Sequence, residues 1–140
     1  MKKLLLIFAV LIINLVSAQD STSVKVDAPK IVSKLMYGST IKVENIEFKF
    51  VAVESDSRCP KGVQCVWAGE AIVLVDVFKN GKKTEQKRLV FSPTSQLQNA
   101  LGNLFSSESL KVSGLNIAPY PEHGTKIKAE DYYVQLSVKN

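Results

Sequence analysis

Both cysteines of the chain and its single tryptophan, Trp67, lie within residues 55–71, whose sequence is SDSRCPKGVQCVWAGEA. Five residues separate Cys59 from Cys65. Two thiols at this spacing could form a disulfide, act as a redox couple or supply two ligands to a metal ion. The compartment and the surrounding residues decide between these chemistries.

A redox or metal role fits this pair poorly. Thiol redox catalysts usually carry C-x-x-C with a helix starting beside it, whereas no helix start follows Cys65. Structural zinc sites favour C-x₂₋₄-C spacing, and the lone histidine, His123, is far along the chain. No EF-hand pattern occurs either. We therefore expect no metal ion and no other cofactor.

The sequence also gives little support for hydrolytic catalysis. One histidine permits one Ser-His-Asp set, but no G-x-S-x-G motif occurs and no motif pairs His123 with a nucleophile. The spacing of Asp56, Glu70 and Asp76 does not select a site with two catalytic carboxylates. We predict that the protein is not an enzyme and has no catalytic residue. A small hydrolase or metal-dependent enzyme is the alternative.

The first 18 residues have the three parts of a secretory signal peptide. Two lysines precede an apolar run, Leu4–Val16, and small residues at 16–18 form a cleavage site. The run is too short to cross a bilayer comfortably, and polar residues follow at once. We expect a signal peptide at residues 1–18 and a single secreted domain at residues 19–140.

An exported chain meets oxidising conditions, in which two cysteines usually pair. Pro60 and Gly62 can turn the segment between Cys59 and Cys65 back on itself, which brings the two Cα atoms within bridging distance. We predict a disulfide that closes this short loop, in a secreted or periplasmic protein. No cysteine lies at the cleavage site for lipid attachment, and no second long apolar run predicts a membrane span.

The other polar and aromatic residues of the stretch have two interpretations. Asp56 can accept backbone N–H groups in an Asx-type turn, and Arg58 can pair with a carboxylate or stack on Trp67. Both would then hold the loop in shape. Alternatively, Arg58 and Trp67 form an exposed recognition pair, because these residue types anchor interfaces. Gly69, next to Glu70, supplies a positive φ or a close backbone approach where the loop re-enters the sheet.

The charge balance does not favour nucleic-acid binding. Without Lys2 and Lys3, 16 of the 18 Lys and Arg residues and all 13 Asp and Glu residues remain, a balance of +3. No basic stripe with interleaved aromatic residues accompanies this mild charge. The densest basic run, residues 79–88, also contains Glu85, and we interpret it as a solvated hairpin rather than a polyanion site.

Strand patterns flank the cysteine loop. Residues 40–43 and 46–53 alternate between apolar and polar, with Ile46, Phe48, Phe50 and Ala52 expected on one face. Residues 71–78 are apolar on both faces, which is typical of a covered central strand. Asn80-Gly81 predicts a two-residue hairpin turn into a strand over residues 84–91.

The C-terminal third predicts two further strands, at residues 110–117 and 132–138. Ser92 and Pro93 could begin a short helix to which Leu97, Leu101, Leu104 and Phe105 would contribute apolar side chains. A strand at residues 23–26 is a further candidate. The pattern predicts an all-β single domain, an antiparallel sandwich or small barrel with at most one short helix.

The motif D-S-R-C-P at residues 56–60, followed by C-V-W-A-G-E-A at 65–71, resembles a group of small secreted or lipoprotein-like bacterial proteins. Pro119-Tyr120-Pro121 and Asp131-Tyr132-Tyr133-Val134 are similar to the C-terminal pattern of that group. The resemblance covers most of residues 38–138. It implies an exported β domain with a disulfide loop, and it carries over no established activity and no catalytic residue.

These observations lead to a hypothesis about function. The chain is expected to be an exported domain without enzymatic activity that binds a protein partner or supports the cell envelope through the cysteine loop. An alternative is an inhibitor of secreted proteases, in which the disulfide loop presents Lys61 to an enzyme cleft. The sequence does not indicate the partner, the strand order or the oligomeric state.

Overall fold

The structure is a computed structural model, which describes residues 30–93 and 102–139. The predicted signal peptide, the candidate strand at residues 23–26 and most of the candidate helix after Ser92 lie outside these ranges. Within them, no helix is long and apolar enough to cross a membrane.

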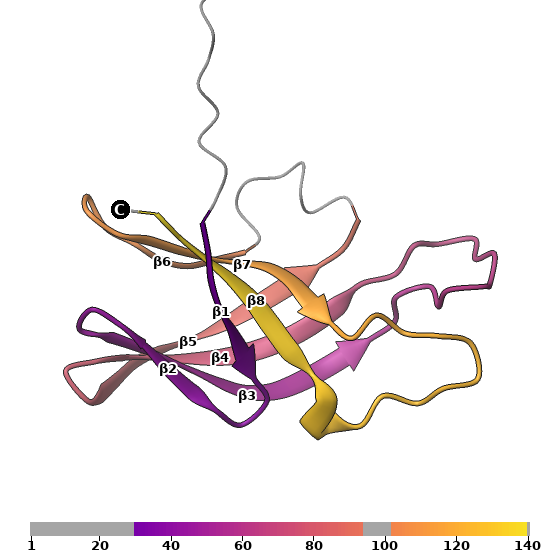
Figure 1. The fold of residues 1–140 in the computed structure, drawn as a ribbon, viewed down its shortest axis with the longest axis horizontal. Helices are drawn as coiled ribbons and strands as arrows, with labels where there is room; N and C mark the ends of the chain where they lie inside the picture. Colours follow the sequence, from indigo (N-terminus) through magenta and orange to yellow (C-terminus); the bar gives the residue numbers. More distant parts are fainter. Residues whose placement is uncertain (1–29, 94–101, 140) are drawn as a thin grey trace, which may run out of the picture.

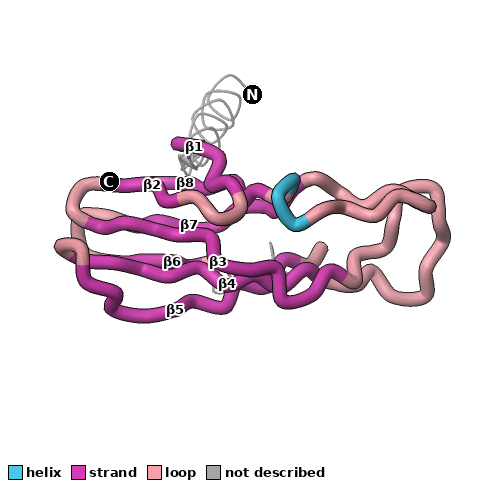
Figure 2. The backbone as a smooth tube through the Cα atoms, turned by 90° about the horizontal axis from the view of Figure 1, so that it is seen from below, coloured by secondary structure: helices cyan, strands magenta, loops and turns pink. Residues whose placement is uncertain are grey.

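The described residues form two four-stranded antiparallel sheets that pack face to face (Figures 1 and 2). One sheet has the strand order β1-β8-β7-β6 and the other the order β2-β3-β4-β5. The all-β sandwich is therefore confirmed. The elements are β1 (Lys30–Met36), β2 (Thr40–Val43), β3 (Ile46–Asp56), β4 (Ala71–Lys79), β5 (Lys82–Phe91), β6 (Asn103–Ser106), β7 (Lys111–Ala118), the 3₁₀ turn η2 (Ala129–Asp131) and β8 (Tyr133–Lys139).

The core lies between the two sheets and follows from the alternation of side chains along each strand. The central strand β4 is buried along most of its length between its neighbours β3 and β5, as its apolar sequence predicts. Fully buried side chains from both sheets include those of Phe48, Phe50, Val73, Val75, Val112, Val134 and Leu136.

The hairpin turn between β4 and β5 has the predicted geometry. Asn80 and Gly81 both have positive φ, 53° and 75°, as a type I′ turn between β4 and β5 requires. Glu44, at the turn between β2 and β3, also has a positive φ of 55°. These local turns set the registers of the sheet that carries the cysteine loop.

Because of a β-bulge in β3, Ala52 lies on the opposite face of the strand from the one predicted. Phe50 and Ala52 pair with adjacent residues of β4, so the register shifts at Val51. The extra residue turns Ala52 to the face opposite Phe50, and the expectation that both face the core is wrong. Val53 packs against the core instead.

Two further strands differ from the sequence-based expectation. Leu104 and Phe105, expected on a helix, lie in the short strand β6, where Leu104 is fully buried. A short apolar run cannot by itself separate a strand from a turn of helix. β1 was not predicted, and its pairing with β8 is interrupted by a register shift that breaks the simple period of two.

Candidate functional site

Two loops project together beyond one end of the sandwich (Figures 1 and 2). The loop from β3 to β4, residues 57–70, is called the stapled loop here, and the loop after β7, residues 119–128, is called the second loop. Ser57 N donates to Glu70 O at 2.8 Å, and Cys59 N donates to Ala68 O at 2.9 Å. The stapled loop therefore begins as a continuation of the β3–β4 pairing.

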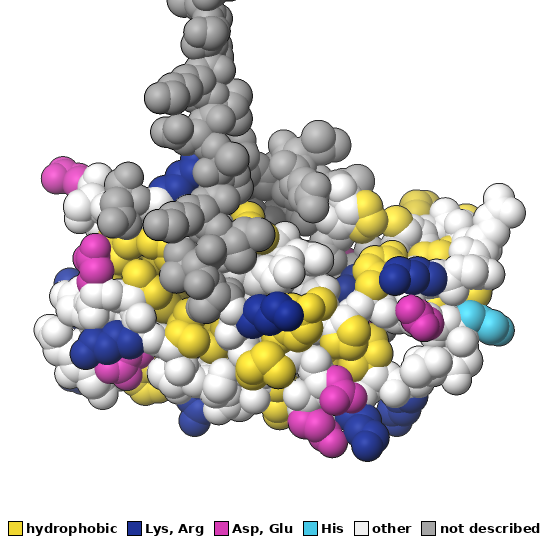
Figure 3. Space-filling model, in the orientation of Figure 1, with side chains coloured by type: hydrophobic (Ala, Val, Ile, Leu, Met, Phe, Trp, Pro, Cys, Tyr) yellow, Lys and Arg dark blue, Asp and Glu magenta, His cyan; other side chains and the backbone are white. Residues whose placement is uncertain are grey.

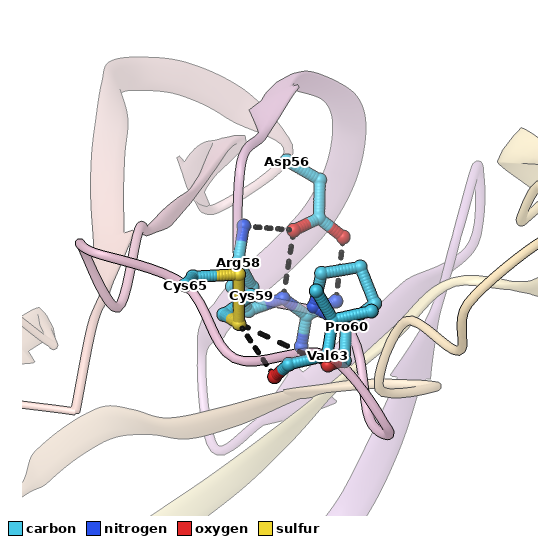
Figure 4. Close-up of a disulfide and its surroundings, with 6 residues drawn as sticks. All are labelled: Asp56, Arg58, Cys59, Pro60, Val63 and Cys65. Carbon is cyan, nitrogen blue, oxygen red and sulfur yellow. Dashed lines mark hydrogen bonds and ion pairs between the residues drawn. A yellow bond between two sulfur atoms is a disulfide. The ribbon is translucent and has the colours of Figure 1, made fainter.

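A disulfide joins Cys59 to Cys65 and closes the outer part of the stapled loop, as predicted (Figure 4). The two Cα atoms are 6.0 Å apart, within the ordinary range for a disulfide. The cross-link confines the residues between the cysteines in both the folded and the unfolded chain.

Gly69 has both properties expected from its position. Its φ is 68°, which L side chains rarely adopt, and a Cβ atom there would overlap the backbone carbonyl of Ser57. Glu70 contributes through its backbone, since its N–H donates to Ser57 Oγ and its carbonyl accepts from the same hydroxyl. The Glu70 residue itself is exposed.

Arg58 lies buried at the base of the stapled loop, with its side chain only 5% exposed. Its Nε and Nη2 donate to the two carboxylate oxygens of Asp56 at 2.8 and 2.6 Å (Figure 4). Nη1 donates to Ile117 O at 2.8 Å, and Nη2 also donates to Pro119 O at 2.9 Å. One guanidinium thus connects the stapled loop to the end of β7 and the start of the second loop.

The Asp56 carboxylate accepts three kinds of hydrogen bond in this cluster. Besides the guanidinium, Arg58 N donates to Oδ1 at 3.3 Å, which is the predicted Asx-type turn, and Tyr132 Oη donates to Oδ2 at 2.9 Å. We call Asp56, Arg58 and Tyr132 the latch. It links β3, the stapled loop and the residue that precedes β8.

The latch changes the acidity of its members. Burial by itself would raise the pKa of the Asp56 carboxyl, but hydrogen bonds from Arg58 and Tyr132 and the charge of Arg58 outweigh it and lower the pKa below its usual value. Burial and the hydrogen bond to Asp56 raise the pKa of Tyr132 to about 12. At neutral pH the cluster therefore consists of a carboxylate, a guanidinium and a neutral phenol.

The hypothesis of an exposed Arg58–Trp67 pair is wrong for Arg58. The guanidinium is buried and lies 5.1 Å from the ring centroid of Tyr120, rather than over Trp67. Trp67 itself is 82% exposed and its neighbour Val66 is 92% exposed. The structure thus separates the two predicted anchors. Arg58 holds the base of the loop, and Trp67 lies at the tip, which we define as residues 63–67.

Lys61 lies between base and tip, and its backbone is already paired. Lys61 N donates to Pro121 O at 3.0 Å, and Lys61 O accepts from His123 N at 3.4 Å. A peptide segment that docks by strand addition offers its own backbone groups to the partner. The pairing of Lys61 with the second loop therefore speaks against its entry into a protease cleft.

Among the described residues, no group of three or more His, Cys, Asp and Glu side chains lies close enough together to hold a metal ion. In the basic hairpin, carboxylates pair with Lys83, Lys87 and Arg88 at 2.7 to 2.8 Å. Charges of both signs are spread over the face drawn in Figure 3 rather than gathered in one patch.

Sequence reasoning found Asp56, Arg58 and the disulfide, but it missed the other partners of the latch. Tyr132 was expected only as the first residue of a strand, and the carbonyls of Ile117 and Pro119 gave no signal at all. Tyr132 is buried, and its hydroxyl is the group that reaches Asp56. A buried tyrosine needs a partner for its hydroxyl, which is the only hint in the sequence.

Comparisons with protein-family models, with curated proteins and with solved structures gave no match to this chain. The site is therefore interpreted from its own geometry. That geometry combines a buried latch at the base of the two loops, a cross-linked loop and an exposed apolar tip.

Proposed function

We propose that the protein is an exported binding module without enzymatic activity, whose contact surface is the tip of the stapled loop. The observation that carries this proposal is the exposure of Val66 and Trp67 on a loop that the disulfide and the latch hold in place. Exposed tryptophan is unusual on a soluble surface and is enriched among residues that dominate binding energy.

The rigidity of the loop supports the same proposal. A contact residue on a preordered loop loses less conformational freedom on binding than one on a flexible loop. The signal-like N-terminal sequence and the disulfide support export to an oxidising compartment. The resemblance to small secreted or lipoprotein-like bacterial proteins, which implies an exported β domain, supports the same part of the proposal.

The experiment measures binding to the immobilised protein. The mature protein is exposed on the surface to fractionated envelope and extracellular proteins of the producing cell, and a fraction that contains the partner should bind saturably. Trp67→Ala, measured by surface immobilisation, should weaken that binding by about thirtyfold or more, the effect of an anchor worth 2 kcal/mol. Its free energy of unfolding should change by less than about 0.5 kcal/mol.

Two matched variants separate contact from folding. Lys82→Ala, an exposed change on β5, should leave binding unchanged. Cys59→Ser with Cys65→Ser should weaken binding and also cost about 2.4 kcal/mol of stability, the loop-entropy value for this ring. Equal binding by Trp67→Ala and the wild-type protein would reject the tip as the contact surface.

A further inference from the structure

A pocket of about 380 Å³ lies beside the base of the stapled loop. Val66 and Trp67 do not line it, so it is a different surface from the tip. Its walls come from four parts of the chain: Arg58 from the stapled loop, Tyr120 from the second loop, residues 91–93 from the end of β5 and just beyond it, and Leu115 and Asn116 from β7.

A β-bulge in β7 supplies two of these walls. The pairing of β7 with β8 shifts register between Gly114 and Asn116, which leaves Leu115 as the extra residue. Ile117 beyond it is buried in the core, whereas Asn116 is exposed and Leu115 half-buried. Bulges redirect side chains and are frequent beside binding sites.

Arg58 contributes an unused hydrogen-bond donor to the pocket. A guanidinium has five N–H bonds, and four of those of Arg58 have acceptors, on Asp56, Ile117 and Pro119. One N–H of Nη1 has no acceptor among the described residues. Because the side chain is more than nine-tenths buried, this donor is expected to find a partner in whatever fills the pocket.

The charges of Arg58 and Asp56 favour a neutral ligand atom as the acceptor for this N–H. The Asp56 carboxylate already neutralises Arg58 at 2.6 Å, so a second carboxylate would bring excess negative charge to a largely buried group. A neutral carbonyl oxygen brings none. The Asn116 side-chain amide, which forms no hydrogen bond within the described residues, can both donate to and accept from a peptide group.

The geometry points to a peptide-binding pocket: a neutral peptide segment places an apolar or aromatic side chain against Tyr120, Phe91 and Leu115, while its backbone carbonyl accepts from Arg58 Nη1. The aromatic and aliphatic walls match such a side chain, and the polar groups match its backbone. This site goes beyond the proposed contact at the tip and does not depend on it.

The test is an NMR titration of the ¹⁵N-labelled mature protein with N-acetyl-phenylalanine amide. We expect saturable shifts of the backbone amides of Phe91, Leu115 and Asn116, with a dissociation constant on the order of 1 mM for a ligand of this size. The amides of Val66 and Trp67 should not shift. Absence of saturable shifts at the pocket up to about ten times that concentration overturns the proposal.

A second probe distinguishes an internal peptide segment from a chain end. N-acetyl-phenylalanine, which carries a free carboxylate, should bind at least about threefold more weakly than the amide, because of the charge balance at Arg58. Equal or tighter binding of the carboxylate overturns the assignment of a neutral acceptor.

Surface variants complete the test without disturbing the latch. Asn116→Ala should weaken binding of the amide by about threefold to tenfold, the range for one lost hydrogen bond. The matched control Asn103→Ala, an exposed asparagine of β6, should bind as the wild type does. Trp67→Ala should also leave this titration unchanged, so failure of the tip and failure of the pocket are distinguishable. Unchanged binding in Asn116→Ala contradicts the proposed geometry.

Discussion

The base and the tip of the stapled loop belong to one short segment, yet they obey different physical rules. At the base, Arg58 is buried and the Asp56 side chain is only 10% exposed, and their hydrogen bonds reach across to β7, the second loop and Tyr132. At the tip, Val66 and Trp67 contact mainly solvent. The comparison teaches that buried polar pairing, rather than apolar packing, positions this loop and leaves its end available for a partner.

The same contrast exists between two ion pairs of the stapled loop, one at its base and one that reaches the second loop. The pair Asp56–Arg58 is nearly inaccessible to water, at 2.6 Å, whereas Lys61–Glu122 spans 3.7 Å with both side chains about two-thirds exposed. Breaking a buried pair leaves an uncompensated charge, but an exposed pair returns to water at little cost. If the comparison is correct, substitutions in the two pairs should have very different effects.

The largest effect is expected from Arg58→Met, which keeps an unbranched apolar side chain and removes the guanidinium with its charge. The Asp56 carboxylate then loses two of its four hydrogen bonds and its counter-charge, and two carbonyl groups lose the guanidinium as a donor. We expect a loss of about 3–5 kcal/mol in the free energy of unfolding, measured by urea denaturation at pH 7. A loss below about 1 kcal/mol would contradict the role of the latch.

A double variant gives the control for this prediction. Asp56→Asn combined with Arg58→Met should cost less than the sum of the two single changes, because the two residues share one network. Additive costs would mean that the two side chains stabilise the loop independently.

The next effect concerns alkaline pH and tests the hydroxyl of Tyr132. Its pKa in the folded protein is raised from 10.0 to about 12, so the folded state retains a proton that the unfolded state has already lost. This contribution to stability is complete below pH 10 and is lost as the pH rises towards 12. The loss should be about 2–3 kcal/mol.

Tyr132→Phe isolates that contribution from the titration of lysines. Urea denaturation of both proteins between pH 9 and 12 should show a steeper decline for the wild type than for the variant. Parallel pH profiles would mean that the Tyr132 hydroxyl does not interact with Asp56 as the geometry indicates.

The smallest effect is expected from the exposed pair. A double-mutant cycle with Lys61→Ala and Glu122→Ala should give a coupling energy below about 1 kcal/mol, which added salt reduces further. The backbone bonds of Lys61 to the second loop remain in these variants. A coupling energy as large as that of Asp56 and Arg58 would remove the distinction between the buried and the exposed ion pair.

Much of the fold could be predicted because it depends on local rules. Alternating side chains indicate most of the strands, Asn80-Gly81 indicates a hairpin, and the close spacing of Cys59 and Cys65 allows a disulfide. The errors arose where a local rule has exceptions. The bulge at Val51 reverses the alternation, and the short apolar run of β6 does not distinguish strand from helix.

For the candidate site, the sequence predicted the residue types in the cysteine loop but not their arrangement in space. The residue types in the cysteine loop indicated a turn, a disulfide and interface anchors, but they did not indicate which anchor is buried. Arg58 bonds to a carbonyl 59 residues away, and Asp56 bonds to a hydroxyl 76 residues away. Such contacts have no signature in the spacing of neighbouring residues.

The amino-acid sequence by itself therefore determined most of the strands, the Asn80-Gly81 hairpin turn and the cross-linked loop, since each depends on residues that are close along the chain. Only the tertiary structure decided that Arg58 faces inward and Trp67 outward. Packing of the two sheets brings the second loop beside the stapled loop, and its carbonyl groups supply acceptors that make burial of the guanidinium favourable. Among the residues that the structure describes, no comparable partners surround the indole ring, which is exposed at the tip.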